Sequence, residues 1–520
     1  MLKALLRIPP LLALSSIAAL AVALGGCANE GPSDNDGGVP EDGATAGRDG
    51  SVRDARPGQD AEDLSMLGAL ITPLPANLIG VPEGGAEVLY VRGDGTLMRS
   101  APDGTGATEL GIKPTFGYGP SPNLWVWTGV DTDNALGTVN LYRPGDPRAV
   151  PLANLAAVDL FGTDEDGHRA LAMVDAVTVG TGMTSTRTAD LVFFDDQGGK
   201  RVLLRGISIG RWDRRIRRHV NSCTPLADFL SEPVAIVLAC PDGATSRTAY
   251  FIDLVTGNTS TVAANVLSFL RVGKDRSFAL LADDQRGFFG VGADGRVIDL
   301  PEQDRLESLA FLDGRRFAYT TSSGQLLIAS WPTMLSTVAL PAGAARIESA
   351  SPTGEHLIFR QMSSMIGLRD LYSISTSTAA SQTPLTLVAE TDGYPGDDAF
   401  SEDGVWAQWF EDGDANYIGN PANRRVDGTG SAKVLGPRGY NIRNTVDPNK
   451  VLLMINTRFS EQTQRLVSDM ATADRSGSGE PTLLVPGVDP VSFAVFEELD
   501  RVFYRIPEGP HAGLWVRTIP

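Results

Sequence analysis

The sequence predicts an all-β fold, a β-propeller built of about ten four-stranded repeat units. The first observation is a turn-rich cluster followed by a short apolar strand, which recurs about every 46 residues along most of the chain. The second is that no window of about 12 residues shows the periodicity of an amphipathic helix. The apolar strands begin at Val88, Leu124, Ala170, Ala235, Phe278, Phe317, Leu357, Val405, Val451 and Val502. A period in the forties with strand signals alone is typical of propeller blades.

Each repeat contains further strands after the first. A polar turn leads to a second apolar strand, marked for example by Leu371-Tyr372, and a second turn often leads to a third, as after Val291. Asp-Gly pairs stand in many of these turns, such as Asp294-Gly295. Because glycine accepts the positive φ that tight hairpins need, these pairs indicate antiparallel strands joined in order.

The last repeat ends early, at Ile519-Pro520, and leaves no room for an outermost strand. At the other end, the apolar segment from Leu67 to Leu74 precedes the first repeat's own leading strand near Leu78-Ile79. We expect residues 67–74 to complete the last blade, because this pairing would remove open sheet edges. The alternative is that this segment packs only as a cap.

Composition and charge exclude several classes of protein. The chain of 520 residues has 44 Lys and Arg against 63 Asp and Glu, a net charge of −19, whereas a nucleic-acid binder is usually basic. A polytopic membrane protein needs several apolar runs of about 20 residues, and the chain has one shorter run. Three cysteines are too few for a small disulfide-stapled scaffold.

The first 27 residues predict export and lipidation. Lys3 and Arg7 precede an apolar run from Leu11 to Gly26, which has the length of a signal-peptide core. The run ends at Cys27 in a sequence that resembles a bacterial lipobox, so we expect residues 1–26 to be a lipoprotein signal and Cys27 to carry the lipid anchor. Ala28 resembles the residue that sorts such proteins to the outer membrane in enterobacteria. We therefore expect a bacterial outer-membrane location, with the protein facing the periplasm or the cell surface. An ordinary signal peptide with an accidental cysteine is the alternative.

The composition of residues 27–65 predicts that this segment is a disordered acidic tether. The segment from Ala28 to Ser65 has ten acidic and three basic residues, a net charge of −7, and no aromatic side chain. Such a segment cannot bury enough apolar surface to offset its chain entropy. We expect the propeller to occupy residues 66–520 as one large ring, or as two smaller rings divided into 66–303 and 304–520.

The repeats resemble the TolB-type, WD40-like propeller repeat of bacterial envelope proteins. That repeat carries Ser-Pro-Asp-Gly before its apolar strand and Leu-Tyr in the next. The best matches are Ser351-Pro352-Thr353-Gly354 with Leu371-Tyr372, and Ser401-Glu402-Asp403-Gly404, while Asp447-Pro448-Asn449-Lys450 departs from the pattern. The resemblance covers about 440 residues. It implies a protein-interaction scaffold and brings no catalytic residues.

Motifs that would carry chemistry are sparse. His168 and His356 stand in repeated turns, where a solvated histidine is the simpler interpretation. The sequence contains no His-Glu-x-x-His and no phosphate-cradling loop. We predict no catalytic residue and no cofactor. Asp412, Asp414 and Asn416 alternate as calcium ligands would, but Tyr417 stands where a calcium loop needs glycine, so this is only a weak metal candidate.

Cys223 and Cys240 are the cysteines that remain after Cys27. Export places them in an oxidising compartment, and their separation suits a disulfide across a hairpin. We therefore predict a disulfide between them. Two unpaired buried thiols are the alternative.

A basic segment interrupts the acidic chain between the third and fourth repeats. Lys200 to Arg218 contains eight cations and one Asp, a net charge of +7. We interpret it as an insert whose cations could bind an anionic partner, such as lipopolysaccharide or a phosphate-rich headgroup. The alternative is a solvated insert that pairs with acidic blade surfaces. The candidate binding residues are Arg211, Arg214, Arg215, Arg217 and Arg218.

Two functions of different classes are consistent with these features. The first is a membrane-anchored scaffold that binds an envelope protein or a glycan, with no nucleic-acid partner. The second is a propeller-type enzyme, a lyase or a hydrolase, with an acidic site at the ring axis. The sequence favours the first, because motifs that would carry chemistry are sparse.

Overall fold

The fold is that of a computed structural model of the chain. It describes residues 67–520 except 74, 83–84, 115, 119–122, 132–135, 158–159, 165–166, 180–185, 214–217, 221–224, 232, 242–243, 245, 284–286, 301–305, 342, 363–368, 378–385, 390–393, 414–417 and 497–499. In this described part the regular structure consists of forty β-strands, and no helix there is long and apolar enough to cross a bilayer.

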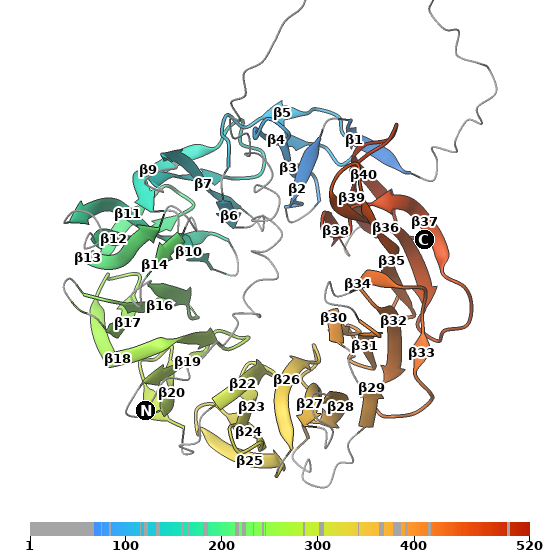
Figure 1. Ribbon diagram of the computed structural model, residues 1–520. Coiled ribbons are helices and arrows are strands. Elements are labelled where there is room, and N and C mark those ends of the chain that lie inside the picture. The colour runs from blue at the N-terminus through green and yellow to red at the C-terminus, as the bar shows by residue number, and fades with distance from the viewer. Residues whose placement is uncertain are drawn as a thin grey trace, which may run out of the picture.

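The described strands form antiparallel sheets that follow one another around a central opening (Figure 1). We call each set of about four successive strands a blade. Within each blade the first strand lies nearest the opening and the later ones lie progressively outward (Figure 1). This is the architecture of a β-propeller, so the predicted all-β propeller fold is confirmed.

The first five blades occupy residues 76–299. Blade 1 comprises β2 (Ala76–Gly80), β3 (Val88–Arg92), β4 (Leu97–Ser100) and β5 (Thr108–Glu109). Blade 2 comprises β6 (Phe116–Tyr118), β7 (Leu124–Asp131), β8 (Leu136–Tyr142) and β9 (Val150–Ala157). Blade 3 comprises β10 (Leu160–Thr163), β11 (Arg169–Val179), β12 (Thr186–Asp195) and β13 (Lys200–Asp213), with β14 (Arg218–Val220) added. Blades 4 and 5 comprise β15 (Leu226–Phe229), β16 (Val234–Ala239), β17 (Arg247–Asp253), β18 (Thr259–Val272), β19 (Phe278–Asp283), β20 (Gly287–Gly292) and β21 (Val297–Asp299).

The other five blades complete the ring. Blade 6 comprises β22 (Leu306–Phe311), β23 (Arg316–Thr321), β24 (Leu326–Ser330) and β25 (Leu335–Leu340). Blade 7 comprises β26 (Ala344–Ala350), β27 (His356–Met362), β28 (Arg369–Ser375) and β29 (Thr386–Ala389). Blade 8 comprises β30 (Tyr394–Phe400), β31 (Trp406–Glu411), β32 (Asn420–Arg425) and β33 (Lys433–Val434). Blade 9 comprises β34 (Gly439–Asn444), β35 (Lys450–Ser460), β36 (Arg465–Asp474) and β37 (Thr482–Val488). Blade 10 comprises β38 (Phe493–Phe496), β39 (Arg501–Ile506), β40 (Gly513–Thr518) and β1 (Ala69–Thr72).

Strand β1 supplies the outermost strand of blade 10. It pairs antiparallel with β40, with Leu70 opposite Trp515, and the Tyr504 hydroxyl donates a hydrogen bond to the carbonyl of Leu67. The sheet order β1–β40–β39–β38 therefore joins the two ends of the described chain. This is the pairing expected for residues 67–74, although the strand itself spans only Ala69–Thr72.

Strand β18 joins blades 4 and 5 into one sheet of seven strands. Its first part pairs with β17, where Thr259 lies opposite Ile252, and its last part pairs with β19, where Val272 lies opposite Ala279. The register shifts between Val266 and Leu270, where the strand changes partners. One continuous strand is thus the outer strand of blade 4 and the inner strand of blade 5.

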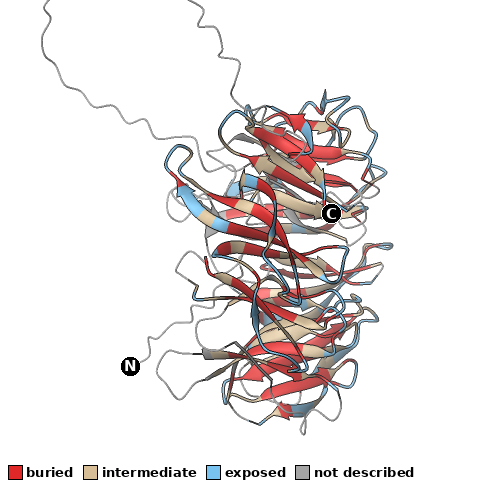
Figure 2. Cartoon of the chain, turned by 90° about the vertical axis from the view of Figure 1, so that its right-hand side faces the viewer, coloured by how far each residue is buried: buried red, intermediate tan, exposed pale blue. Residues whose placement is uncertain are grey.

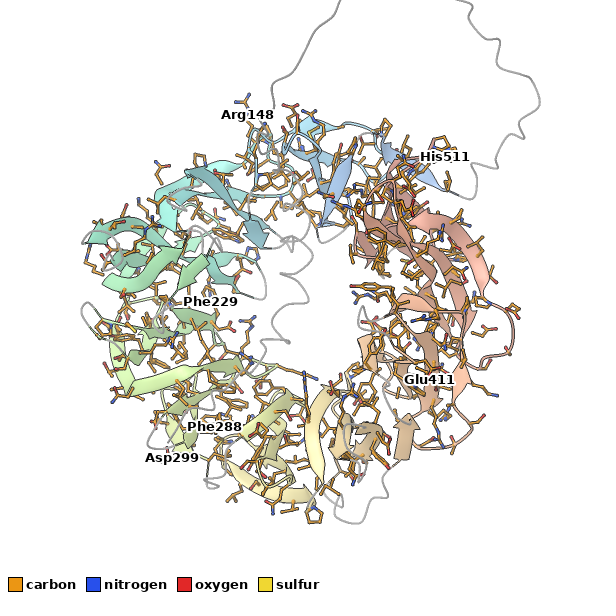
Figure 3. The ribbon with its side chains drawn as sticks, in the orientation of Figure 1. Arg148, Phe229, Phe288, Asp299, Glu411 and His511 are labelled. Atoms are coloured by element: carbon orange, nitrogen blue, oxygen red, sulfur yellow. The ribbon has the colours of Figure 1, made fainter. Side chains whose placement is uncertain are left out.

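Apolar side chains fill every junction between neighbouring blades. Leu89 of blade 1 packs in one cluster with Val126 of blade 2, and Phe503 of blade 10 packs in another with Val88 of blade 1. Phe229 belongs to the cluster between blades 3 and 4 (Figure 3). Buried residues lie mainly within the sheets, and exposed residues lie at the turns (Figure 2). Burial of such apolar area is the main stabilising contribution to the ring.

Polar side chains also connect neighbouring blades through the backbone. The Trp125 Nε1–H of blade 2 donates a hydrogen bond to the carbonyl of Gly167 in blade 3, at 2.7 Å. The Ser373 hydroxyl of blade 7 donates to the carbonyl of Val426 in blade 8, at 2.9 Å. These bonds satisfy turn carbonyls that the sheets themselves leave unpaired.

Blades 3 and 9 share a device that the other described blades do not show in the same form. In blade 3 the Asp190 carboxylate accepts a hydrogen bond from the backbone N–H of Gly206, at 2.9 Å. In blade 9 the Asp469 carboxylate accepts one from Gly487, at 3.1 Å. Both glycines have a positive φ, 60° and 69°, at a break in the strand register. The device thus holds a β-bulge in the outermost strand of each blade.

The basic segment differs from its interpretation as an insert. Lys200–Asp213 is strand β13, the outer strand of blade 3, and its end pairs with β14, with Asp213 opposite Arg218. As an outer strand, β13 exposes part of its length to water, including Lys200, Arg201 and Arg205, so it does not need the apolar alternation of an inner strand. The many cations of this segment therefore led to its interpretation as an insert, although it forms strand β13.

Candidate functional site

A pocket of about 270 Å³ lies between blades 3 and 4, and we call it the interblade pocket. Its walls come from the turn before β11, the turn after β12, the turn before β16 and the turn after β17. Four turns from two blades thus meet at one face of the ring. The lining residues are His168, Arg169, Phe193, Asp195, Asp196, Gln197, Pro233, Leu254 and Val255.

One wall of the interblade pocket is polar and comes from blade 3. His168 Nδ1 lies 2.5 Å from Asp196 Oδ2, and the Gln197 side-chain amide donates to Asp196 Oδ1 at 3.0 Å. Burial by itself raises the pKa of Asp196, but the hydrogen bonds from His168 and Gln197 favour the ionised form more strongly. The pKa of Asp196 therefore lies below its ordinary value.

The turn after β12 is held in place by a second carboxylate. Asp195 Oδ1 accepts hydrogen bonds from the backbone N–H groups of Gln197, at 3.0 Å, and of Gly199, at 2.6 Å. An aspartate that accepts backbone N–H groups in this way forms an Asx turn. The turn fixes the place of Gln197, so the polar wall is built by local sequence.

The opposite wall is apolar and comes mainly from blade 4. Pro233, Leu254 and Val255 line it, and Val255 is 64% exposed. The Arg201 guanidinium of blade 3 donates hydrogen bonds to the carbonyls of Leu254, at 2.8 Å, and of Val255. This contact holds the blade 4 turn against blade 3 and so sets the width of the pocket.

Charged side chains on the inner strands of blades 7 to 9, and Arg360 on the adjacent strand β27, engage one another. The Arg360 Nε lies 2.6 Å from Glu348 Oε1, and Arg346 lies 3.9 Å from the same oxygen. The Arg443 guanidinium lies 3.3 Å from Asp398 Oδ1. An acidic site at the ring axis would need carboxylates free to meet a substrate, whereas these two carboxylates are engaged by arginines.

Asp228 is a carboxyl on an inner strand whose pKa is raised above its ordinary value, although its side chain is 41% exposed. It lies on β15, accepts a hydrogen bond from Phe229 N–H at 2.8 Å and lies 3.1 Å from the Arg276 guanidinium. Burial raises the pKa of Asp228, and Arg276 and Arg271 offset this only in part. Within the described residues, no group of three or more His, Cys, Asp or Glu side chains could hold a metal ion.

Several predicted site residues lie outside the described part of the chain. These are the lipidation residue Cys27, the cations Arg214, Arg215 and Arg217, Cys223, and the weak metal candidates Asp414 and Asn416. For Arg211 and Arg218 the structure gives only the backbone positions, on β13 and β14. Predictions about these side chains stay predictions.

The described members of those predicted sets are Cys240 and Asp412. Cys240 is fully buried and takes part in a disulfide, while the pairing with Cys223 stays a prediction. Asp412 has a positive φ of 53°, and its carboxylate accepts a hydrogen bond from the Asn420 amide at 3.4 Å. Asp412 thus lies in the turn after β31, and its role as a weak metal candidate stays a prediction.

Sequence reasoning did not find the interblade pocket. It treated His168 as a solvated turn residue, and the side chain is indeed 54% exposed, but it also contacts Asp196. The only local signal was the turn from Asp195 to Gly199, which resembles other hairpin turns in the chain. The apolar wall comes from the next blade, some 60 residues later, so local sequence could not reveal it.

Comparisons with known proteins add little beyond the fold. No protein-family model matches the chain, and no curated protein matches it. Among solved structures, the chain is similar to the crystal structure of the tricorn protease, with a TM-score of 0.32 and 10% sequence identity. The match covers 86% of this chain and 52% of that chain, so this chain spans about half the length of that one.

Proposed function

We propose that this protein is a lipid-anchored lipoprotein of the bacterial cell envelope whose propeller binds a protein or a glycan. Lipidation of Cys27 would attach the chain to the outer membrane, and the acidic segment 27–65 would act as a spacer. The propeller, held by this spacer, would present its faces and rim to partners in the periplasm or at the cell surface. The TolB-type repeat resemblance supports an interaction role.

The observation that carries the binding role is the arrangement of charge and surface around the ring. Glu348 and Asp398 on described inner strands are engaged by arginines, while the interblade pocket opens on a face with both polar and apolar walls. Pockets of mixed lining, with a few convergent polar groups, are typical binding sites. A binding scaffold accounts for this arrangement better than an enzyme acting at the axis.

The position of β1 supports the anchor. Because β1 is the outermost strand of blade 10, the described chain begins at the outer rim of the ring (Figure 1). A tether attached at the rim leaves the turns of both faces accessible.

Two measurements test this proposal. Cells that produce the full chain are labelled with a radioactive or clickable fatty acid, and Cys27→Ser is compared with the wild type. We expect label and membrane recovery for the wild type and loss of both in the variant. The second measurement is a pull-down from envelope extract with residues 66–520 as bait. Equal labelling of Cys27→Ser would overturn the anchor, and failure to enrich any protein or glycan would overturn the binding role.

A further inference from the structure

We propose that the interblade pocket binds a single neutral sugar residue of a glycan. This inference rests on the proposed binding function and names the ligand class. It is drawn from three properties of the pocket: the state of its carboxylates, its opposed walls and its size.

The carboxylates of the pocket are already engaged within the protein. Asp196 lies against His168 and Gln197 through its two oxygens, and one oxygen of Asp195 accepts two backbone N–H groups. A lysine or arginine side chain entering the pocket would compete with these partners and would meet the like charge of Arg169, which also lines the pocket. The pocket therefore does not favour a cationic ligand.

The Gln197 side chain suits hydroxyl groups. Beyond the N–H that donates to Asp196, its amide has a second N–H and a carbonyl. A planar amide that both donates and accepts can bind two adjacent hydroxyls. A sugar ring presents several hydroxyls of this kind.

The opposite wall suits the other side of a sugar ring. Pro233, Leu254 and Val255 form an apolar surface, and Phe193 of β12 also lines the pocket. A sugar ring has C–H groups on its faces, which pack on apolar or aromatic side chains while its hydroxyls point to polar groups. Polar and apolar walls from two different blades thus match the two sides of one ring.

The size of the pocket limits the ligand. Its volume of about 270 Å³ is just below the range usual for pockets that hold drug-sized molecules. One sugar ring fits this space, and an extended chain would continue outside it over the exposed turns. The pocket would therefore recognise a terminal or protruding sugar.

Binding is tested by ligand-observed NMR and calorimetry on residues 66–520. The neutral probes are glucose, galactose, mannose and N-acetylglucosamine. The charged probes are Nα-acetyl-lysine amide and Nα-acetyl-arginine amide, which keep their cationic side chains. We expect saturable binding of at least one sugar with a dissociation constant near 1 mM, and no binding of the charged probes. Binding of a charged probe without any sugar, or of none of the probes, would overturn the proposal.

Three variants locate the site. Gln197→Leu removes a hydrogen-bonding group, and Val255→Trp fills the pocket from the apolar wall. Val446→Trp is the matched control, because Val446 is also an exposed turn valine and belongs to blade 9. We expect at least tenfold weaker sugar binding for the first two variants and unchanged binding for the control. Sugar binding that neither Gln197→Leu nor Val255→Trp weakens would place the site elsewhere and overturn the proposal.

The envelope pull-down separates failure of this inference from failure of the proposed function. If the wild type captures a glycan and Gln197→Leu does not, both stand. If both capture the same partner equally, the pocket is not the binding site and this inference is wrong, while the scaffold function holds. If the wild type captures nothing, the proposed function itself is wrong.

Discussion

Arg475 is a buried guanidinium at the junction of blades 8 and 9. It is 1% exposed and donates one hydrogen bond, to Asn444 Oδ1 at 2.7 Å, while its Nε and Nη1 have no partner. Burial lowers the pKa of Arg475 to about 10, because the nearby carboxylates of Asp403 and Asp398 offset the loss of water only in part. The charge itself therefore costs stability, whereas the volume of the side chain contributes to packing.

Two substitutions separate these effects. We expect Arg475→Met, which keeps most of the volume, to leave the free energy of unfolding unchanged or raise it by about 1 kcal/mol. Arg475→Ala leaves a cavity and is expected to lower that free energy by about 2 kcal/mol. Urea denaturation followed by tryptophan fluorescence measures both. An equal loss in the two variants would show that the hydrogen bond to Asn444 dominates.

His356 makes the stability depend on pH. It begins β27 and is half-buried, and burial lowers its pKa below the ordinary value although Glu355 and Asp427 act in the opposite direction. The unfolded chain therefore binds a proton at this residue more readily than the folded chain. At pH 7.5 His356 is neutral in both states and does not oppose folding. As the pH falls through the ordinary histidine pKa, the unfolded chain gains a proton first, so the free energy of unfolding decreases.

The thermal midpoint measures this contribution. We expect the midpoint to fall between pH 7.5 and pH 5.5 in the wild type, and to fall less in His356→Gln. His511→Gln is the control, and its pH dependence is expected to match that of the wild type. A fall of the same size in His356→Gln and the wild type would contradict the assignment.

At the scale of elements, the bulges of blades 3 and 9 depend on a glycine. Gly487 has a φ of 69°, and a Cβ at this position would meet no atom within 4 Å. Any cost of Gly487→Ala thus comes from the backbone alone, and we expect the free energy of unfolding to fall by about 1 kcal/mol. Gly479→Ala is the matched control, because it is also uncrowded but does not have a positive φ. Chemical denaturation compares the two, and a control that loses as much would exclude backbone strain as the cause.

The sequence predicted the inner elements well and the outer ones poorly. Predicted strand starts at Val88, Leu124 and Phe278 coincide with the first residues of β3, β7 and β19. These strands lie in the interior of their blades and are packed on both faces, so their apolar runs are nearly continuous. No sequence pattern indicated that β18 belongs to two blades. A single strand that changes partners has the same apolar pattern as two successive strands. The interblade pocket was also missed, because stacking of blades brings its walls together.

At the scale of the molecule, stability depends on β1. Leu67 and Ile71 are buried against blade 10 and its neighbours, and each buried aliphatic side chain contributes about 1.5–3 kcal/mol. We expect removal of residues 1–75 to lower the thermal midpoint and to cause self-association through the edge of β40. Removal of residues 1–66 is the control, and it should change neither. Light scattering during a thermal melt records both effects, and equal melts would mean that the ring holds without β1.

The pairing of β1 with β40 also constrains the order of assembly. Ala69 is synthesised early, and its partner Val516 is among the last residues of the chain. Contacts of such large sequence separation form slowly, because the chain between them must first be organised. During synthesis, the residues of β1 therefore stay unpaired until β40 has emerged. A protein built in this way needs its early segment shielded, so we expect its yield to depend on chaperones that bind exposed strands.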